Sequence, residues 1–154
     1  MPNDTTPLPA KALPLHGTGD LRLSIITSPE LPTGHLANTV ATIAAGLGAA
    51  HPGIGNVPLP DANGLTILNS ADRPIPILQA GAAQMLEIIQ KAQAHRPDLT
   101  LVAFPEFARK LHSFADYEAA FPQRALATEP LSGVGLCGPT KLVKSLTGAL
   151  KLLR

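Results

Sequence analysis

The sequence predicts a layered α/β domain, because strand-like and helix-like segments alternate along most of the chain. Short runs rich in β-branched residues predict the strands, and longer segments with apolar side chains at helical spacing predict the helices. Turns containing proline or glycine separate the two kinds of segment. A length of 154 residues fits one domain, and a hydrophobic content of 45% indicates a packed core.

The first strand is expected at residues 21–27, where a β-rich run ends at a Ser-Pro turn. A helix follows at 34–47, because its main apolar residues recur in steps of four, three and four. Thr33 is the expected N-cap of this helix, and Gly48 is its expected C-terminal stop.

A hairpin is predicted at residues 56–68, where a Pro-Asp-Ala-Asn-Gly turn at 60–64 separates two short apolar runs. Another strand is expected at 75–78. Pro74 and Pro76 restrict that strand to a sheet edge, or else mark its start, because proline donates no backbone hydrogen bond.

The next segments predict a second helix at 82–94 and a strand at 99–104. The strand is a continuous apolar run, so we expect it to be covered on both faces. The expected buried side of the helix consists of Met85, Ile88, Ile89 and Ala92.

A long excursion, residues 105–130, precedes the last strand. Ser113, three residues before Asp116, resembles part of a helix-capping box. The aromatic side chains near this excursion are spaced as in a helix that packs into a core, which is the favoured interpretation; a lid over a ligand and base stacking are the alternatives. These aromatic residues are Phe104, Phe107, Phe114, Tyr117 and Phe121.

The last strand is expected at 134–137, and Pro139 is expected in the first turn of the final helix. Gly148 is expected to end or kink that helix. The glycines at 133–138 satisfy the Gly-x-Gly-x-x-Gly pattern of dinucleotide sites, but no Asp or Glu follows them. We therefore interpret these glycines as allowing close packing between a strand and a helix. The apolar stripe of the final helix is Leu142, Leu146, Leu150 and Leu153.

The charge and cysteine content limit the classes of function. A formal net charge of +1 provides no field that would steer the chain toward nucleic acid or a membrane. Cys137, the single cysteine, excludes an internal disulfide framework and a zinc site built from cysteines, and it is expected in the core. The five histidines show no metal-ligand spacing, so neither a metal nor another cofactor is predicted.

Residues 1–20 are rich in proline and end in two glycines, so we expect a flexible tail followed by one domain at 21–154. This tail does not resemble a signal peptide, and no apolar run reaches the ~20 residues of a spanning helix. The expected location is therefore the cytoplasm. Charged residues make up only 15%, which suggests that part of the surface is covered by a second copy, as in a homodimer.

The candidate site lies at the start of the first helix, because ligands of α/β sheets collect where strands end and helices begin. His35, Asn38 and Thr39 could line a cleft there, or they could form a solvated turn. Glu106 follows the strand at 99–104, and a carboxylate meeting a histidine would form an acid–base pair. The candidate catalytic residues are His35 and Glu106, and the candidate ligand-binding residues are Thr33, Gly34, Asn38, Thr39, Arg109 and His112.

Two segments, residues 22–49 and 133–153, resemble type 2 peptidyl-tRNA hydrolase. The chain resembles more closely a related bacterial family of unknown function, the domain of unknown function 2000, over residues 21–154. That likeness includes the Asp-Ala-Asn-Gly hairpin and a Phe-Pro-Glu-Phe segment. The resemblance implies a three-layer α/β/α sandwich around a small mixed β-sheet, with the peptidyl-tRNA hydrolase type 2 fold, often dimeric.

The hydrolase family begins its first helix with Gly-Lys and carries a glutamine and a histidine further along it. Here Gly34 is followed by His35, and Thr39 and Thr42 stand at the glutamine and histidine positions. A largely neutral histidine holds phosphate poorly at pH 7 compared with lysine. The resemblance therefore implies a retained fold with altered chemistry.

Three functions remain open from the sequence. The leading hypothesis is a domain that binds or transforms a small ligand at the start of the first helix. The alternative is an active peptidyl-tRNA hydrolase, which would need a phosphate-binding surface such as Lys141, Lys144 and Lys151. The third hypothesis is a dimeric interaction module without a reactive centre.

Overall fold

The computed structural model describes residues 20–154. The tail expected at residues 1–20 therefore lies outside the described residues, apart from Asp20. Within 20–154, no helix combines the length and apolar character that crossing a membrane requires.

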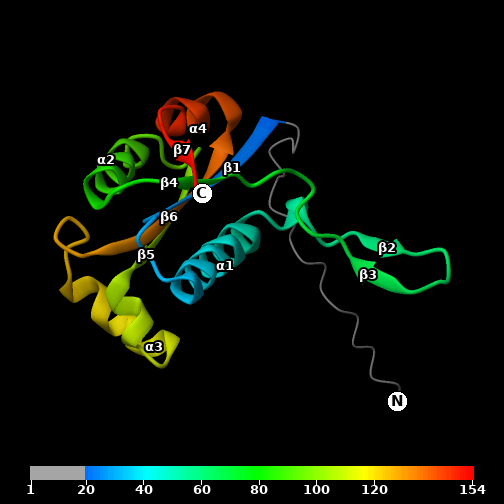
Figure 1. Ribbon diagram of the computed structural model, residues 1–154, viewed down its shortest axis with the longest axis horizontal. Coiled ribbons are helices and arrows are strands. Elements are labelled where there is room, and N and C mark those ends of the chain that lie inside the picture. The colour runs from blue at the N-terminus through cyan, green and yellow to red at the C-terminus, as the bar shows by residue number, and fades with distance from the viewer. Residues whose placement is uncertain (1–19) are drawn as a thin grey trace, which may run out of the picture.

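A small mixed sheet forms the centre of the domain, with strand order β5-β6-β1-β4-β7 (Figure 1). Only β1 and β4 are parallel, and the other neighbouring strands of this sheet are antiparallel. The mixed α/β class predicted from the sequence is thereby confirmed. The strands are β1 (Leu21–Thr27), β4 (Ile77–Gln79), β5 (Thr100–Pro105), β6 (Leu131–Pro139) and β7 (Lys151–Leu152).

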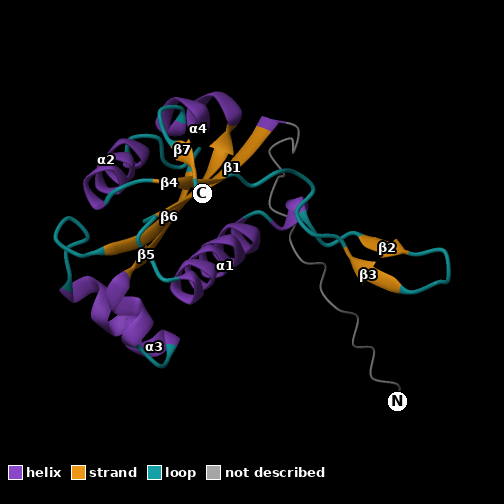
Figure 2. Ribbon diagram, viewed as in Figure 1, coloured by secondary structure: helices purple, strands orange, loops and turns teal. Residues whose placement is uncertain are grey.

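Helices cover both faces of this sheet (Figure 2). Helix α1 (Thr33–Ala50) packs on one face, where Ile43 and Leu47 join a core cluster with residues of β1 and β6. Helices α2 (Ala82–Gln93) and α4 (Thr140–Thr147) pack on the opposite face. As predicted, α2 buries Met85, Ile88, Ile89 and Ala92.

The glycines of β6 allow α1 to approach the sheet closely. A Cβ atom on Gly133 would lie 2.8 Å from Cγ2 of Thr39, and one on Gly135 would overlap Ile43. Real Cβ contacts of this kind are absent from packed proteins because the atoms would repel. A Cβ on Gly138 would lie 2.7 Å from Cδ1 of Leu99. The structure thus confirms close strand–helix packing at Gly133 and Gly135, whereas Gly138 packs against the segment that precedes β5 and not against a helix.

Both predicted ends of α1 are wrong. Pro32, not Thr33, precedes the helix, and no side chain caps it. The helix also continues past Gly48 to Ala50. A glycine inside a helix costs only about 1 kcal/mol, whereas Pro52 lacks an amide hydrogen and cannot extend the helix.

The last segment also differs from the prediction. Pro139 ends β6 and precedes α4 instead of lying within its first turn. Helix α4 ends at Thr147 with Gly148 at its C-cap, so the stop expected at this glycine is confirmed. Beyond it the chain forms β7, whose backbone groups pair with β4; Leu153 N donates to Ile77 O. The stripe expected to run to Leu153 is therefore interrupted.

Strand β5 lies at the edge of the sheet, and the prediction that helices cover both of its faces is confirmed. Its side chains contact the cores on both faces, but most of them are only partly buried because no strand pairs with the outer edge. Strand β4 lies between β1 and β7. Pro74 and Pro76 precede it, so the strand-start alternative is the correct one.

The excursion after β5 contains two short 3₁₀ turns, at Glu106–Lys110 and Phe121–Gln123, and helix α3 (Phe114–Ala120). Asp116 N donates to the Ser113 hydroxyl at 3.1 Å, which confirms the predicted cap. Phe107 is buried, and its ring lies 5.8 Å from that of Tyr117. Phe114 is 71% exposed, so the core packing expected for this side chain is wrong, because α3 packs on the excursion and not on the sheet.

The predicted hairpin is confirmed. Strands β2 (Pro58–Pro60) and β3 (Thr66–Leu68) form a separate two-stranded sheet that projects from the body of the domain (Figures 1 and 2). Asp61 organises its turn, since one carboxylate oxygen accepts from the backbone N–H groups of Asn63 and Leu65, both at 2.8 Å. Gly64 adopts a φ of +85°, which favours glycine.

Candidate functional site: a crevice at the carboxyl ends of β1 and β4

The parallel pair of strands defines a switch point in the topology. Strands β1 and β4 are neighbours, yet α1, which follows β1, and α2, which follows β4, lie on opposite faces of the sheet. Where helices diverge in this way, a crevice opens beyond the carboxyl ends of the strands, and α/β proteins commonly bind ligands there.

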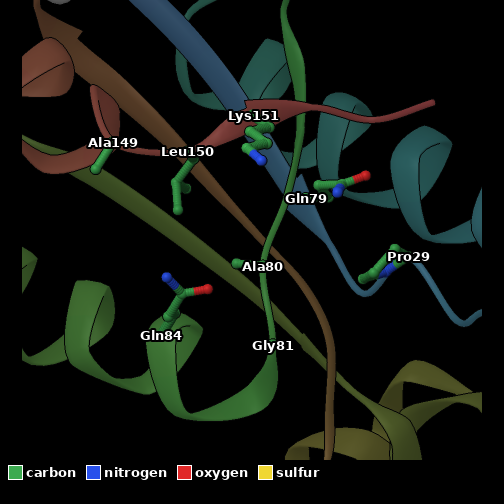
Figure 3. Close-up of a pocket in the computed structure, with 8 residues that line it drawn as sticks. All are labelled: Pro29, Gln79, Ala80, Gly81, Gln84, Ala149, Leu150 and Lys151. Atoms are coloured by element: carbon green, nitrogen blue, oxygen red, sulfur yellow. The ribbon is translucent and has the colours of Figure 1, made fainter.

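A cavity of about 250 Å³ occupies this position (Figure 3). One wall comes from the loop after β1, another from the end of β4 and the first turn of α2, and a third from the segment between α4 and β7. The lining residues are Pro29, Gln79, Ala80, Gly81, Gln84, Ala149, Leu150 and Lys151.

Backbone hydrogen bonds fix the walls relative to one another. Ala80 N donates to Thr27 O at 3.1 Å, which holds the end of β4 beside the end of β1. Gln79 pairs with Lys151 in the register of β4 and β7, so the lysine lies at the rim. In Figure 3 the Gln84 side chain extends from α2 toward Leu150.

The cavity is rich in hydrogen-bond donors and contains no acid. Lys151 is the only charged residue among those that line it. The first turn of α2 carries no acidic residue and receives no side-chain cap from Gly81. Its first N–H groups therefore lack a partner within the helix, and they add a partial positive charge. This combination favours an anionic or carbonyl-bearing ligand.

Two residues of the sequence-predicted site meet on the other face of the sheet. Arg109 donates from Nη2 to the Thr39 hydroxyl at 2.9 Å, although 70 positions separate them in the chain. The guanidinium also lies 5.4 Å from the centre of the Phe104 ring. These contacts fix the excursion after β5 onto α1.

Further polar atoms are buried near this contact. Phe104, Gly133 and Thr27 are neighbours in the register of β5, β6 and β1, and Gly133 contacts Thr39. Thr27 is fully buried, and neither its hydroxyl nor Nε of Arg109 has a hydrogen-bond partner within residues 20–154. Buried donors without partners are uncommon in proteins, so this cluster is a second polar region beside the crevice.

The remaining predicted site residues are exposed. Thr33, Gly34, His35 and Asn38 lie on the first turns of α1, and Glu106 and His112 lie on the excursion, all open to solvent. In the described part of the chain, no hydrogen bond joins His35 to Glu106, so the structure does not bring these two groups together as a bonded acid–base pair.

Gln79 and Gln84 were not recognised from the sequence, and Lys151 was named only for the phosphate-binding surface of the alternative hydrolase hypothesis. The rule that ligands collect at strand ends applies equally to the strand at 75–78, and it would have drawn attention to the first two. The sequence placed Lys151 beside the final helix and not beside the strand at 75–78, because its segment was assigned to that helix.

His51 is another residue without a sequence signal. Its Nε2 lies 2.8 Å from the Thr100 hydroxyl, and burial lowers the pKa of this histidine below 6.5.

A second cavity, of about 230 Å³, lies at the carboxyl-terminal end of α2 and includes Arg96. Among residues 20–154, no group of three or more potential ligands is placed to hold a metal ion.

The fold and crevice define a mixed α/β domain with a ligand-sized cavity at a switch point. The chain belongs to the family described as "Protein of unknown function (DUF2000)", which matches residues 22–154. This agrees with the stronger of the two resemblances noted in the sequence.

A solved structure is also similar: the protein of unknown function Atu0240 from Agrobacterium tumefaciens strain C58. The TM-score is 0.78 at 21% sequence identity, and the match covers 86% of this chain and 97% of that chain. At this identity the likeness shows the fold alone. The comparison with curated proteins found no match.

Proposed function

We propose that this protein binds a small anionic molecule, of the carboxylate or phosphate class, in the crevice at the carboxyl ends of β1 and β4. The observation that carries the proposal is a cavity at the switch point whose only charged lining residue is Lys151. A lysine and the uncapped N–H groups at the start of a helix, both on the wall of one cavity, each favour an anion there.

The volume limits the size of the ligand. About 250 Å³ is below the range of roughly 300–1,000 Å³ that is usual for drug-sized molecules. The two glutamine side chains offer amide groups that can orient a polar ligand. Leu150 and Pro29 supply apolar surface for a short carbon skeleton.

The lining residues favour binding over catalysis. None of the eight is a histidine, cysteine, serine, aspartate or glutamate, so Lys151 is the single residue of the cavity wall that could act as a base or a nucleophile, and no second group is there to activate it. The proposed site lies beside the start of α1, whereas the sequence predicted a site at the start of that helix. No observation in the described residues favours peptidyl-tRNA hydrolysis at the exposed His35.

The test is a titration of the ¹⁵N-labelled protein with inorganic phosphate and with a short dicarboxylate, followed by NMR. We expect saturable shifts of the Gly81–Gln84 amides in the parent protein, because these groups face the anion. Lys151→Gln should weaken binding at least tenfold, since it removes the charge but keeps a polar side chain of similar length.

Lys144→Gln is the matched control. Lys144 is also exposed and close in sequence, but it lies on α4 and does not line the cavity. We expect it to bind as the parent does. Shifts that do not saturate, or an equal loss in both variants, would contradict the proposal, because general charge screening would then explain the response.

A further inference from the structure

Strand β5 is an edge strand without the features that usually protect such an edge (Figure 1). Residues 100–104 contain no proline and no charged side chain. By contrast, β7 at the other edge of the same sheet is two residues long and begins with Lys151, and β2 of the hairpin begins and ends with proline. Proteins commonly shorten an edge strand or place lysine or proline in it, because an open edge can pair with a further strand. The outer edge of β5 is therefore available for such pairing.

The hydrogen bonds between β6 and β1 show which backbone groups of β5 point outward. Ser28 N donates to Ser132 O, so this pair is hydrogen-bonded, and bonded pairs alternate with unbonded ones along an antiparallel ladder. The odd-numbered residues 133–137 of β6 therefore direct their N–H and C=O groups toward β5. Their partners in β5 are Thr100, Val102 and Phe104. Leu101 and Ala103 then direct their backbone groups outward, and neither N–H has a backbone partner within residues 20–154.

The cavity of about 230 Å³ adjoins the start of this edge. The end of α2 and the turn after it form one wall, and the start of β5 forms the other. The lining residues are Gln93, Arg96, Pro97, Leu99, Thr100 and Leu101. Its volume is below the roughly 300–1,000 Å³ usual for drug-sized ligands, so it suits one residue of a peptide. It shares no lining residue with the crevice at β1 and β4, so the two sites are separate.

Arg96 is the single charged residue among those that line this cavity. Its side chain is exposed and forms no ion pair or hydrogen bond within residues 20–154. Asp98, the nearest acid in the sequence, does not line the cavity. The carbonyl groups at the end of α2 have partners of their own, since His95 N donates to Ala92 O. An arginine in this setting favours a carboxylate, which can accept hydrogen bonds from two of its N–H groups.

We propose that the edge of β5 binds the carboxyl-terminal segment of an extended peptide, which adds a strand at Leu101 and Ala103 and directs its terminal carboxylate to Arg96. In strand addition, main-chain hydrogen bonds supply affinity and an adjacent pocket supplies selectivity. A peptide that runs antiparallel to β5, as β6 does, has its carboxyl end beside the start of β5, where the cavity lies. A second copy of β5 would not supply the carboxylate, because residues 99–105 contain no acidic side chain.

Amide hydrogen exchange of the full chain, followed by NMR, tests the pairing. The probe is the pentapeptide acetyl-Thr-Val-Thr-Val-Thr with a free carboxyl terminus, which consists of residues common in strands and carries no other charge. At millimolar peptide we expect the amides of Leu101 and Ala103 to exchange about fivefold more slowly, because the peptide bonds to them. The amides of Val102 and Phe104 already bond to β6 and should change little. Unchanged exchange at Leu101 and Ala103, or slowing in the hairpin alone, would overturn the proposal.

The same peptide with a carboxyl-terminal amide tests the role of Arg96. We expect the parent protein to bind the free acid about fivefold more tightly than the amide, and Arg96→Gln to remove this preference. Lys91→Gln is the matched control, because Lys91 is also an exposed cation near the end of α2, but it pairs with Glu87 and does not line the cavity. A preference that persists in Arg96→Gln, or is lost equally in Lys91→Gln, would contradict the proposal.

Ala103→Pro tests the backbone contact directly. It removes an N–H that points outward, so the bonds to β6 are retained while one bond to the peptide is lost. We expect both forms of the peptide to bind more weakly, and undiminished binding would contradict the proposal. If this variant fails to fold, the exchange experiment and the Arg96 comparison still decide. Slower exchange at Leu101 and Ala103 as the protein concentration rises without peptide would show a second copy at this edge and would also overturn the proposal.

Discussion

Strand β6 and the β2–β3 hairpin are both apolar segments, but they have opposite environments. Residues 131–138 of β6 are all buried between helices on the two faces of the sheet, whereas every residue of the hairpin strands is exposed. The difference comes from what packs on each segment. Glycines in β6 allow α1 to pack closely on that strand. Pro58 and Pro60 lack backbone N–H groups, so a further strand cannot pair regularly with the outer edge of β2. Apolar composition alone therefore does not report burial.

Truncating an apolar side chain in each region should give the largest difference. Ile43→Ala removes a fully buried side chain that packs on β6, and we expect a loss of about 3–4 kcal/mol in the free energy of unfolding. Leu68→Ala in the hairpin, where the side chain is 59% exposed, should change it by less than about 0.5 kcal/mol. Urea denaturation measures both. Similar losses in the two variants would show that the hairpin is covered even at low protein concentration.

Adding a methyl group to β6 tests how tightly that strand is packed, whereas the truncations above remove side-chain atoms. Gly135→Ala should destabilise the protein by about 2–3 kcal/mol, because its Cβ overlaps Ile43 and reaches 3.0 Å from Leu47. Gly48→Ala is the control, since a Cβ there meets nothing within 4 Å. That substitution lies inside α1 and should stabilise the helix by up to about 1 kcal/mol. If Gly135→Ala unfolds at the same urea concentration as the parent, the close approach of α1 to β6 is not required.

Local patterns were sufficient to predict the elements of the core. The spacing in α2 identified its four buried residues, and the glycine spacing in β6 indicated close packing. The β7 strand was missed because its two residues form a strand only through pairing with β4, more than seventy positions earlier. No local pattern reports such a pairing.

The candidate site was harder to predict for the same reason. The rule about strand ends indicated the region beyond β1, but the crevice also needs Gln84 from α2 and Lys151 from the far edge of the sheet. Thr39 and Arg109 were both named from the sequence. Their hydrogen bond depends on Gly133, which lets the Thr39 methyl group lie against β6. A contact of this kind depends on three elements at once, and a linear pattern describes only one.

The smallest predicted effect concerns pH and the junction between α1 and β5. Burial lowers the pKa of His51 below 6.5, so the folded protein binds this proton less tightly than the unfolded chain does. The contribution of His51 to stability is then complete above pH 6.5 and declines as the pH falls from 6.5 through the folded-state pKa. We expect the urea midpoint of the parent to fall slightly more than that of His51→Gln between pH 7 and pH 5.5.

His51→Gln is a suitable reference because glutamine can still bond to the Thr100 hydroxyl but does not titrate. The exposed His35, His95 and His112 are present in both proteins, so their effects cancel in the comparison. Parallel pH profiles would contradict the prediction and would place the His51 ring in solvent. A steeper decline of the urea midpoint in the parent would instead show that a neutral His51 imidazole holds the carboxyl-terminal end of α1 against the edge strand β5. The hairpin has no helix packed against it in this way.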